Sequence, residues 1–133
     1  LEIARLYNYI LQEEKSNYGI VHALDGYDEI SLTGGFKLFT NKGEQLIQPE
    51  DIGQKKIEQS AIFGGNSVAD AAKIFKTILD GKGTDAQNNV VLTNAAFALK
   101  VVEETKSFET CFEEAKEALF NFKAKACLTK LLQ

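Results

Sequence analysis

The chain has 133 residues, of which 44% are hydrophobic and 26% are charged, with 19 acidic residues against 15 Lys and Arg residues. This composition is typical of a soluble globular domain with a real core, and it excludes a disordered or collagen-like chain. The net charge of −4 argues against a nucleic-acid or anionic-membrane surface, and no apolar run is long enough to cross a bilayer. We therefore expect a cytoplasmic protein that binds neither nucleic acid nor membrane.

The first residue is Leu1, and the chain contains no Met. A newly made cytoplasmic protein normally begins with Met. We therefore expect the sequence to be a portion of a longer protein that was cut or processed ahead of this residue.

The two cysteines are expected to be free thiols. Cys111 and Cys127 lie 16 positions apart in a stretch whose pattern predicts one continuous helix. At about 1.5 Å per residue, their Cα atoms would be roughly 24 Å apart, which is too far for a disulfide. Two cysteines and one histidine also cannot complete a four-ligand zinc site. Any metal site must therefore use carboxylates.

The start of the chain predicts a helix followed by a buried strand. Ile3, Leu6 and Ile10 recur at helical spacing, which indicates a helix that packs one face and ends near Lys15. Residues 18–24 are almost continuously apolar, as in a parallel strand that is covered on both faces. A helix followed by such a strand indicates α/β architecture.

A hairpin is predicted next. Residues 29–33 and 36–40 are extended in pattern and flank Gly34 and Gly35, which fit the turn of a β-hairpin. Residues 45–48 predict a further short strand after a second turn.

The second half of the chain predicts three helices. Ser67 with Asp70, and Thr84 with Gln87, have the spacing of capping boxes at two helix starts. The helix after Thr84 is apolar nearly all round, so it should be central and buried. The last helix starts at Ser107 and carries an apolar stripe. The predicted fold class is α/β, with a partial parallel or mixed sheet, a β-hairpin and packed C-terminal helices.

Three carboxylates follow the predicted buried strand, in the run Asp25-Gly-Tyr-Asp-Glu29. In open α/β sheets, ligands bind just beyond the carboxyl ends of the strands. Mg²⁺ is commonly held by one or two carboxylates together with substrate phosphates, so Asp28 and Glu29 are the candidate ligands. Neighbouring residues of an extended chain point to opposite faces, so the pair needs a bent backbone or two ions. A solvated acidic turn is the alternative that the spacing leaves open.

Four other places could carry chemistry, and a structural role is the better interpretation of each. His22 shares a strand face with apolar residues, where a hydrogen-bonded core histidine is commoner than a ligand. Gly34 and Gly35 are flanked by strands and fit a turn better than a phosphate loop. Residues 64–67 precede a helix, where amides can bind an anion but capping alone explains them. Asn94 should bridge elements inside the most apolar helix. No catalytic residue is predicted.

Four segments carry a family pattern: the run from His22 to Gly34 (His-Ala-Leu-Asp-Gly-Tyr-Asp-Glu-Ile-Ser-Leu-Thr-Gly), residues 49–53 (Pro-Glu-Asp-Ile-Gly), residues 63–67 (Phe-Gly-Gly-Asn-Ser) and residues 91–96 (Val-Leu-Thr-Asn-Ala-Ala). In this order they resemble the anthranilate phosphoribosyltransferase family, and the match runs through the whole chain. Two positions depart from the pattern: Ala23, where the family usually has Gly, and Asn66, where Asp is common. Neither is a predicted metal ligand.

The resemblance implies a catalytic domain of the nucleoside phosphorylase and phosphoribosyltransferase type. It also implies a Mg²⁺-dependent enzyme of tryptophan biosynthesis that joins anthranilate to the ribose of phosphoribosyl pyrophosphate. In that family the Asp-Glu pair binds Mg²⁺ facing the pyrophosphate, so the resemblance gives Asp28 and Glu29 the metal-binding role. The full-length protein is expected to be a homodimer.

The resemblance further implies that residues 1–133 are the carboxyl-terminal part of the α/β domain. The family's Gly-Thr-Gly-Gly-Asp phosphate loop, its Lys-His-Gly-Asn segment, its anthranilate-contacting Arg and its small helical domain all lie upstream of the matched part. We therefore expect the chain alone to be inactive in transfer. Two alternatives remain open: an enzyme like pyrimidine-nucleoside phosphorylase, and a non-catalytic relative that only binds a partner.

Overall fold

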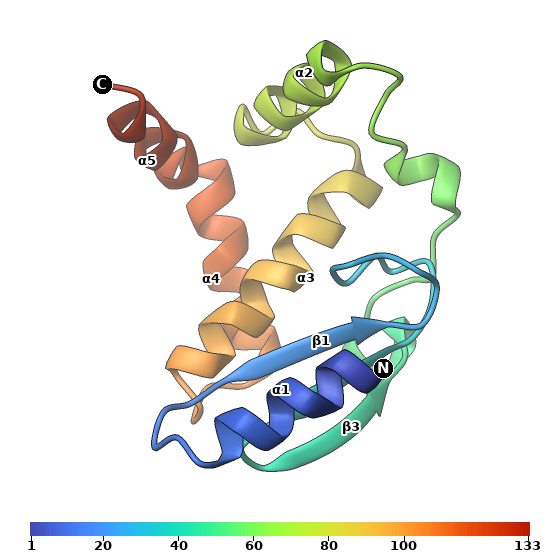
Figure 1. Ribbon diagram of the computed structural model, residues 1–133. Helices are drawn as coiled ribbons and strands as arrows, with labels where there is room; N and C mark the ends of the chain where they lie inside the picture. The colour runs from blue at the N-terminus through green and yellow to red at the C-terminus, as the bar shows by residue number, and fades with distance from the viewer.

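The computed structural model describes residues 1–133 and contains five α-helices, three strands and two short 3₁₀ helices. In chain order the elements are α1 (Glu2–Gln12), β1 (Gly19–Ala23), β2 (Phe36–Thr40), β3 (Gly43–Ile47), η1 (Pro49–Ile52), η2 (Gln59–Ile62), α2 (Val68–Leu79), α3 (Asp85–Val102), α4 (Phe108–Phe120) and α5 (Lys123–Leu131). In Figure 1 the sheet and α1 lie at one end, α2 and α5 lie at the other, and α3 runs between them. None of the helices has the length and apolar character that a membrane span requires.

The sheet has the strand order β1-β2-β3 and is antiparallel throughout. The α/β class, the hairpin and the packed C-terminal helices are confirmed, whereas the parallel or mixed pairing is not found among these strands. The prediction that residues 18–24 form a strand buried on both faces is wrong for this chain, since β1 is an edge strand and only its last residue, Ala23, is buried. β2 follows β1 through a loop without a crossover helix, and a parallel neighbour needs such a crossover.

The hairpin is formed by β2 and β3 rather than by residues 29–40. Thr40 pairs with Gly43 across the two-residue turn at Asn41 and Lys42. Residues 29–33 form bends instead of a strand. Leu32 has a φ of 61° with a fully buried side chain, and a left-handed residue cannot continue an extended ladder.

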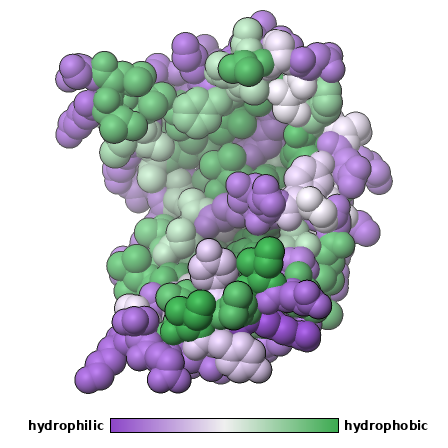
Figure 2. All heavy atoms as spheres, viewed as in Figure 1, coloured by the Kyte–Doolittle hydropathy of each residue, from purple (hydrophilic) through white to green (hydrophobic).

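The predicted apolar stripe of α1 faces outward. Ala4 is the buried residue of this helix, whereas Ile3 is 72% exposed and Ile10 is 55% exposed. Figure 2 shows apolar side chains gathered over this part of the surface, in the lower half of the view. The spacing predicted the helix correctly, but the face that packs against the rest of the chain is the one that contains Ala4, not the apolar stripe.

The core lies where α3 meets the sheet and α4. One buried cluster joins the sheet, the β1–β2 loop and α3, and consists of Ile30, Leu32, Phe36, Leu38, Ile47 and Phe97. A second cluster joins α3 to α4 through Leu92, Ala115 and Leu119. The predicted central position of α3 is confirmed, and its N-terminus carries the predicted capping box between Thr84 and Gln87.

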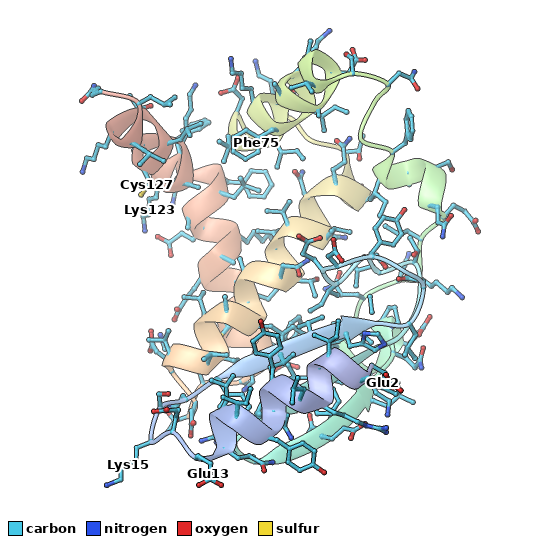
Figure 3. The ribbon with its side chains drawn as sticks, in the orientation of Figure 1. Glu2, Glu13, Lys15, Phe75, Lys123 and Cys127 are labelled. Atoms are coloured by element: carbon cyan, nitrogen blue, oxygen red, sulfur yellow. The ribbon has the colours of Figure 1, made fainter.

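The last helix is two helices, so the prediction of one continuous helix is wrong. Asn121 ends α4, and Phe122 follows with a φ of 58° before α5 begins. The break lets α5 approach α2, where Lys125 Nζ lies 2.6 Å from Asp80 Oδ1. Figure 3 shows Cys127 on α5. Cys111 is buried and Cys127 is exposed, and both are free thiols as predicted.

Candidate metal-binding loop

The candidate site is the loop that connects β1 to β2, residues 24–35, which we call the acidic loop. Its two ends are joined because the Leu24 N–H donates to the Gly35 carbonyl at 3.0 Å. In Figure 1 this loop turns back beside α3 before the chain enters β2. The loop is therefore closed at its base by the antiparallel pair and lies against the central helix.

Asp25 holds the two sides of the acidic loop together. Its Oδ2 accepts hydrogen bonds from Ser31 Oγ at 2.6 Å and from Thr33 Oγ1 at 2.5 Å. Its Oδ1 accepts a longer bond from the Tyr27 N–H at 3.4 Å. Burial acts to raise the pKa of Asp25, but these hydrogen bonds favour the carboxylate and leave the pKa below its ordinary value. Asp25 is therefore an ionised anchor that is already supplied with donors.

The two glycines of the loop lie close to neighbouring side chains. A Cβ on Gly34 would lie 3.0 Å from Asp25 Oδ2, and a Cβ on Gly35 would lie 2.6 Å from the amide nitrogen of Gln48. At Gly34 the carboxylate of Asp25 would have to shift to accept a side chain, whereas at Gly35 the contact is with the end of the exposed Gln48 side chain, which can move away. The prediction that these glycines form the turn of a β-hairpin is wrong, because residues 29–33 form no strand and Gly35 leads directly into β2.

Asn94 on α3 holds the loop from the other side. Its Oδ1 accepts from the Ile30 N–H at 3.0 Å, and its Nδ2 donates to the carbonyls of Ile30 at 2.8 Å and Val90 at 2.9 Å. This confirms the predicted bridging role. Ile30 directly follows Glu29, so the backbone next to the acidic pair is fixed to the central helix.

Asp28 and Glu29 lie between these two fixed points. Both are exposed, and both lie in backbone bends, as a cooperating pair of neighbours needs. Neither takes part in a salt bridge. No group of three or more His, Cys, Asp or Glu side chains gathers to hold a metal ion. Two uncommitted carboxylates suit Mg²⁺, which retains waters and completes its shell with substrate phosphates.

The other candidates have structural roles or are peripheral. Ser67 Oγ accepts from the Asp70 N–H at 3.1 Å and caps α2. Asp70 Oδ2 in turn accepts from the Asn66 N–H at 3.3 Å and from Ser67 Oγ at 2.8 Å. The anion position at this helix start is thus filled by a carboxylate of the chain itself, which supports the capping interpretation. His22 is half-buried in β1, where it pairs with Lys37 of β2.

Sequence reasoning missed the role of Asp25 and its two hydroxyl partners. Ser31 and Thr33 are polar and yet buried, and a buried hydroxyl needs a hydrogen-bond partner. The available signal in the sequence was the pair Ser31 and Thr33, which flank Leu32 and follow Asp25 by six and eight positions. The left-handed Leu32 between them left no trace in the residue pattern.

Together, the fold and the acidic loop define an α/β unit that presents a free carboxylate pair next to a sheet. Residues 1–125 match the model of a family described as "Glycosyl transferase family, a/b domain". The chain belongs to this family.

Curated relatives specify the resemblance further. The chain is 50% identical over its full length to an anthranilate phosphoribosyltransferase of Flavobacterium psychrophilum, and 44% identical to one of Bacteroides fragilis. In both cases it covers 40% of the relative's length. The predicted resemblance to anthranilate phosphoribosyltransferases is confirmed, and the chain spans about two-fifths of those proteins.

Solved structures share the fold. The anthranilate phosphoribosyltransferase of Thermus thermophilus superposes with a TM-score of 0.82 at 24% identity, over 97% of this chain and 39% of the other. The Saccharomyces cerevisiae enzyme, solved in complex with PRPP and Mg, gives a TM-score of 0.79 at 21% identity, over 96% of this chain and 37% of the other. The predicted α/β class agrees with both.

Proposed function

We propose that the protein containing this chain transfers the phosphoribosyl group of phosphoribosyl pyrophosphate to anthranilate, a reaction of tryptophan biosynthesis. The family membership and the whole-chain similarity to anthranilate phosphoribosyltransferases support this proposal. The observation that carries it is the acidic loop, where Asp28 and Glu29 are exposed and uncommitted between two fixed points. Phosphoribosyl transfer requires a place for the cation that accompanies pyrophosphate.

In this proposal Asp28 and Glu29 hold Mg²⁺. When bound, the ion neutralises the negative charge that builds on the departing pyrophosphate. The two carboxylates bind and orient the cation, and their exposure leaves its remaining coordination positions open to water and phosphate oxygens. Asn94 keeps the backbone beside the pair in place through Ile30. The S. cerevisiae relative was solved with PRPP and Mg, and a pair of free carboxylates is a donor set that suits this combination of ligands.

The proposal also concerns the rest of the protein. In the proposed protein, residues 1–133 are the carboxyl-terminal part of the α/β domain, and the groups that bind the phosphates and anthranilate lie outside this chain. The chain covers 40% of the F. psychrophilum relative, which is consistent with such a division. The full-length protein works as a homodimer in the cytoplasm. The chain alone forms no phosphoribosyl anthranilate, because it holds only the metal-binding corner of the site.

A chimera tests the proposed function. These 133 residues replace the corresponding segment of the F. psychrophilum relative, which aligns with the chain from end to end at 50% identity. We expect the chimera to form phosphoribosyl anthranilate. Asp28→Asn with Glu29→Gln should lower kcat/KM by about a hundredfold or more, because the charge stabilisation supplied by a metal ion is worth several kcal/mol.

The matched control is Glu13→Gln with Glu14→Gln. These residues are another exposed neighbouring acidic pair, and Figure 3 shows Glu13 at the end of α1. The control removes the same charge from a different place and should keep the activity of the chimera. A chimera that folds but is inactive, or equal losses in the two double variants, would contradict the proposal.

A further inference from the structure

The acidic loop contains a third carboxylate that is used differently from the other two. Asp28 and Glu29 are exposed, whereas Asp25 is half-buried and faces inward onto Ser31 and Thr33. Its Oδ2 lies at hydrogen-bond distance from both hydroxyls, and a glycine at position 34 leaves room for that oxygen. Both carboxylate oxygens of Asp25 therefore accept hydrogen bonds from residues of the loop.

The hydroxyls that serve Asp25 are themselves fixed. Ser31 is 4% exposed and Thr33 is 8% exposed, and Ser31 Oγ also accepts from the Thr33 N–H at 3.0 Å. Between them, Leu32 inserts its side chain fully into the core. Leu32, with its left-handed backbone, lies between the two residues whose hydroxyls reach the same carboxylate. Ser31 Oγ and Thr33 Oγ1 also lie 3.0 Å apart, so one hydroxyl can donate to the other. Removing the carboxylate would therefore leave one buried hydroxyl donor without an acceptor.

We propose that Asp25 is a positioning residue for the metal-binding pair: by binding Ser31 and Thr33 it holds the loop in the bent form that presents Asp28 and Glu29. The inference rests on the proposed function, because it assigns Asp25 a role toward the cation held by those two residues. Groups that hydrogen-bond directly to metal ligands typically contribute a factor of about 10 to 100 in metal affinity. Asp25 contacts Ser31 and Thr33 rather than the ligands, so we expect an effect at the lower end of that range. Asp25 acts through the backbone of the loop and not as a ligand.

The variants must separate positioning from charge, since Asp25 also adds a negative charge near the cation. Ser31→Ala with Thr33→Val removes both hydroxyls, keeps the charge of Asp25 and nearly keeps the volume of residue 33. Thr33→Ser retains the hydroxyl and is the conservative variant. Asp25→Asn removes the charge. Thermal unfolding of each variant establishes that it is folded at the temperature of the measurement.

Two measurements on the 133-residue chain test the inference. The first is calorimetric titration with Mg²⁺, from which the heat of the same titration into buffer is subtracted. The second is amide hydrogen exchange at Asp28 and Glu29 without metal. We expect the Ser31→Ala/Thr33→Val variant to bind Mg²⁺ about tenfold more weakly and to exchange faster at both amides. Thr33→Ser should behave like the unmodified chain in both measurements.

The outcomes distinguish this inference from the proposed function. Unchanged affinity and unchanged exchange in the Ser31→Ala/Thr33→Val variant would overturn the positioning role. The positioning role would also be overturned if Asp25→Asn weakened Mg²⁺ binding and Ser31→Ala/Thr33→Val did not, because Asp25 would then act through its charge. If the unmodified chain and its Asp28→Asn/Glu29→Gln variant bind Mg²⁺ equally, the metal assignment fails, and the exchange measurement still decides whether Asp25 orders the loop.

Discussion

Two polar segments of this chain, the acidic loop and residues 64–70, contain carboxylates and glycines, yet they differ in what those carboxylates contact. In the acidic loop, Asp25 takes the available donors, and Asp28 and Glu29 are left free. In residues 64–70, Asp70 lies in the first turn of α2, accepts hydrogen bonds from Asn66 and Ser67, and is the only carboxylate of the segment. The presence of acidic residues therefore does not define a metal site. Which carboxylates are free to bind a cation is found only after the hydrogen bonds are assigned.

The two loops also differ in what holds them. The acidic loop is attached to the core by the buried side chains of Ile30 and Leu32, and to α3 by the hydrogen bonds of Asn94. Residues 64–67 are largely outside the core, and a helix cap is their main attachment. Changes in the acidic loop should therefore cost more stability than changes in the other loop, and the following predictions test this difference.

The largest effect is expected at Leu32. Leu32→Ala should lower the free energy of unfolding by about 3 kcal/mol, because it empties a fully buried position. Leu32→Gly removes more side chain but relieves a left-handed backbone that costs an ordinary residue about 1 to 2 kcal/mol. Urea denaturation should find the Gly variant at least as stable as the Ala variant. A clearly less stable Gly variant would show that the strain at Leu32 is absent.

A smaller effect is expected at Ser67. Ser67→Ala removes the side chain that caps α2 and should cost about 1 kcal/mol. Ser67→Asn is the matched control, because it keeps an acceptor for the helix amides. Both variants should bind Mg²⁺ like the unmodified chain. Weaker Mg²⁺ binding in Ser67→Ala would indicate that the cation binds near residues 64–67, and would contradict a site in the acidic loop.

The smallest effect concerns pH. Hydrogen bonds hold the pKa of Asp25 below its ordinary value of 3.8, so the folded chain binds this proton less readily than the unfolded chain. The resulting stabilisation is fully present at pH values above the unfolded-state pKa of 3.8. It is lost as the pH falls through the lowered pKa of the folded chain. The stability difference between the unmodified chain and Asp25→Asn should therefore shrink in urea titrations below about pH 4. A difference that is constant down to pH 2 would contradict this role of the hydrogen bonds.

Local signals in the sequence predicted most of the elements but not their partners. The capping residues Ser67 and Thr84 marked two helix starts correctly, because a cap depends only on neighbouring residues. The stripe containing Ile3 predicted a helix, but the choice of the packed face depends on distant segments. Phe122 broke the last helix through a left-handed backbone that no periodicity reveals.

The candidate site was predicted in the same uneven way. Asp28 and Glu29 were singled out by their place after a strand and by the family pattern, and the structure leaves both free to bind. The anchoring of the loop by Asp25 was not predicted, because it requires Ser31 and Thr33 to converge on one oxygen. That convergence depends on how the loop folds back on Asp25, which is a tertiary feature.

Paramagnetic NMR tests the central claim, that the free carboxylates of the acidic loop form the cation site. Mn²⁺ prefers the same oxygen ligands as Mg²⁺ and broadens the signals of nearby amides. With pyrophosphate and a small amount of Mn²⁺ added to the isotopically labelled chain, the broadening should centre on Asp28 and Glu29 and disappear in the Asp28→Asn/Glu29→Gln variant. Broadening centred on residues 64–70, or spread evenly over the exposed acidic residues of α4, would contradict the account.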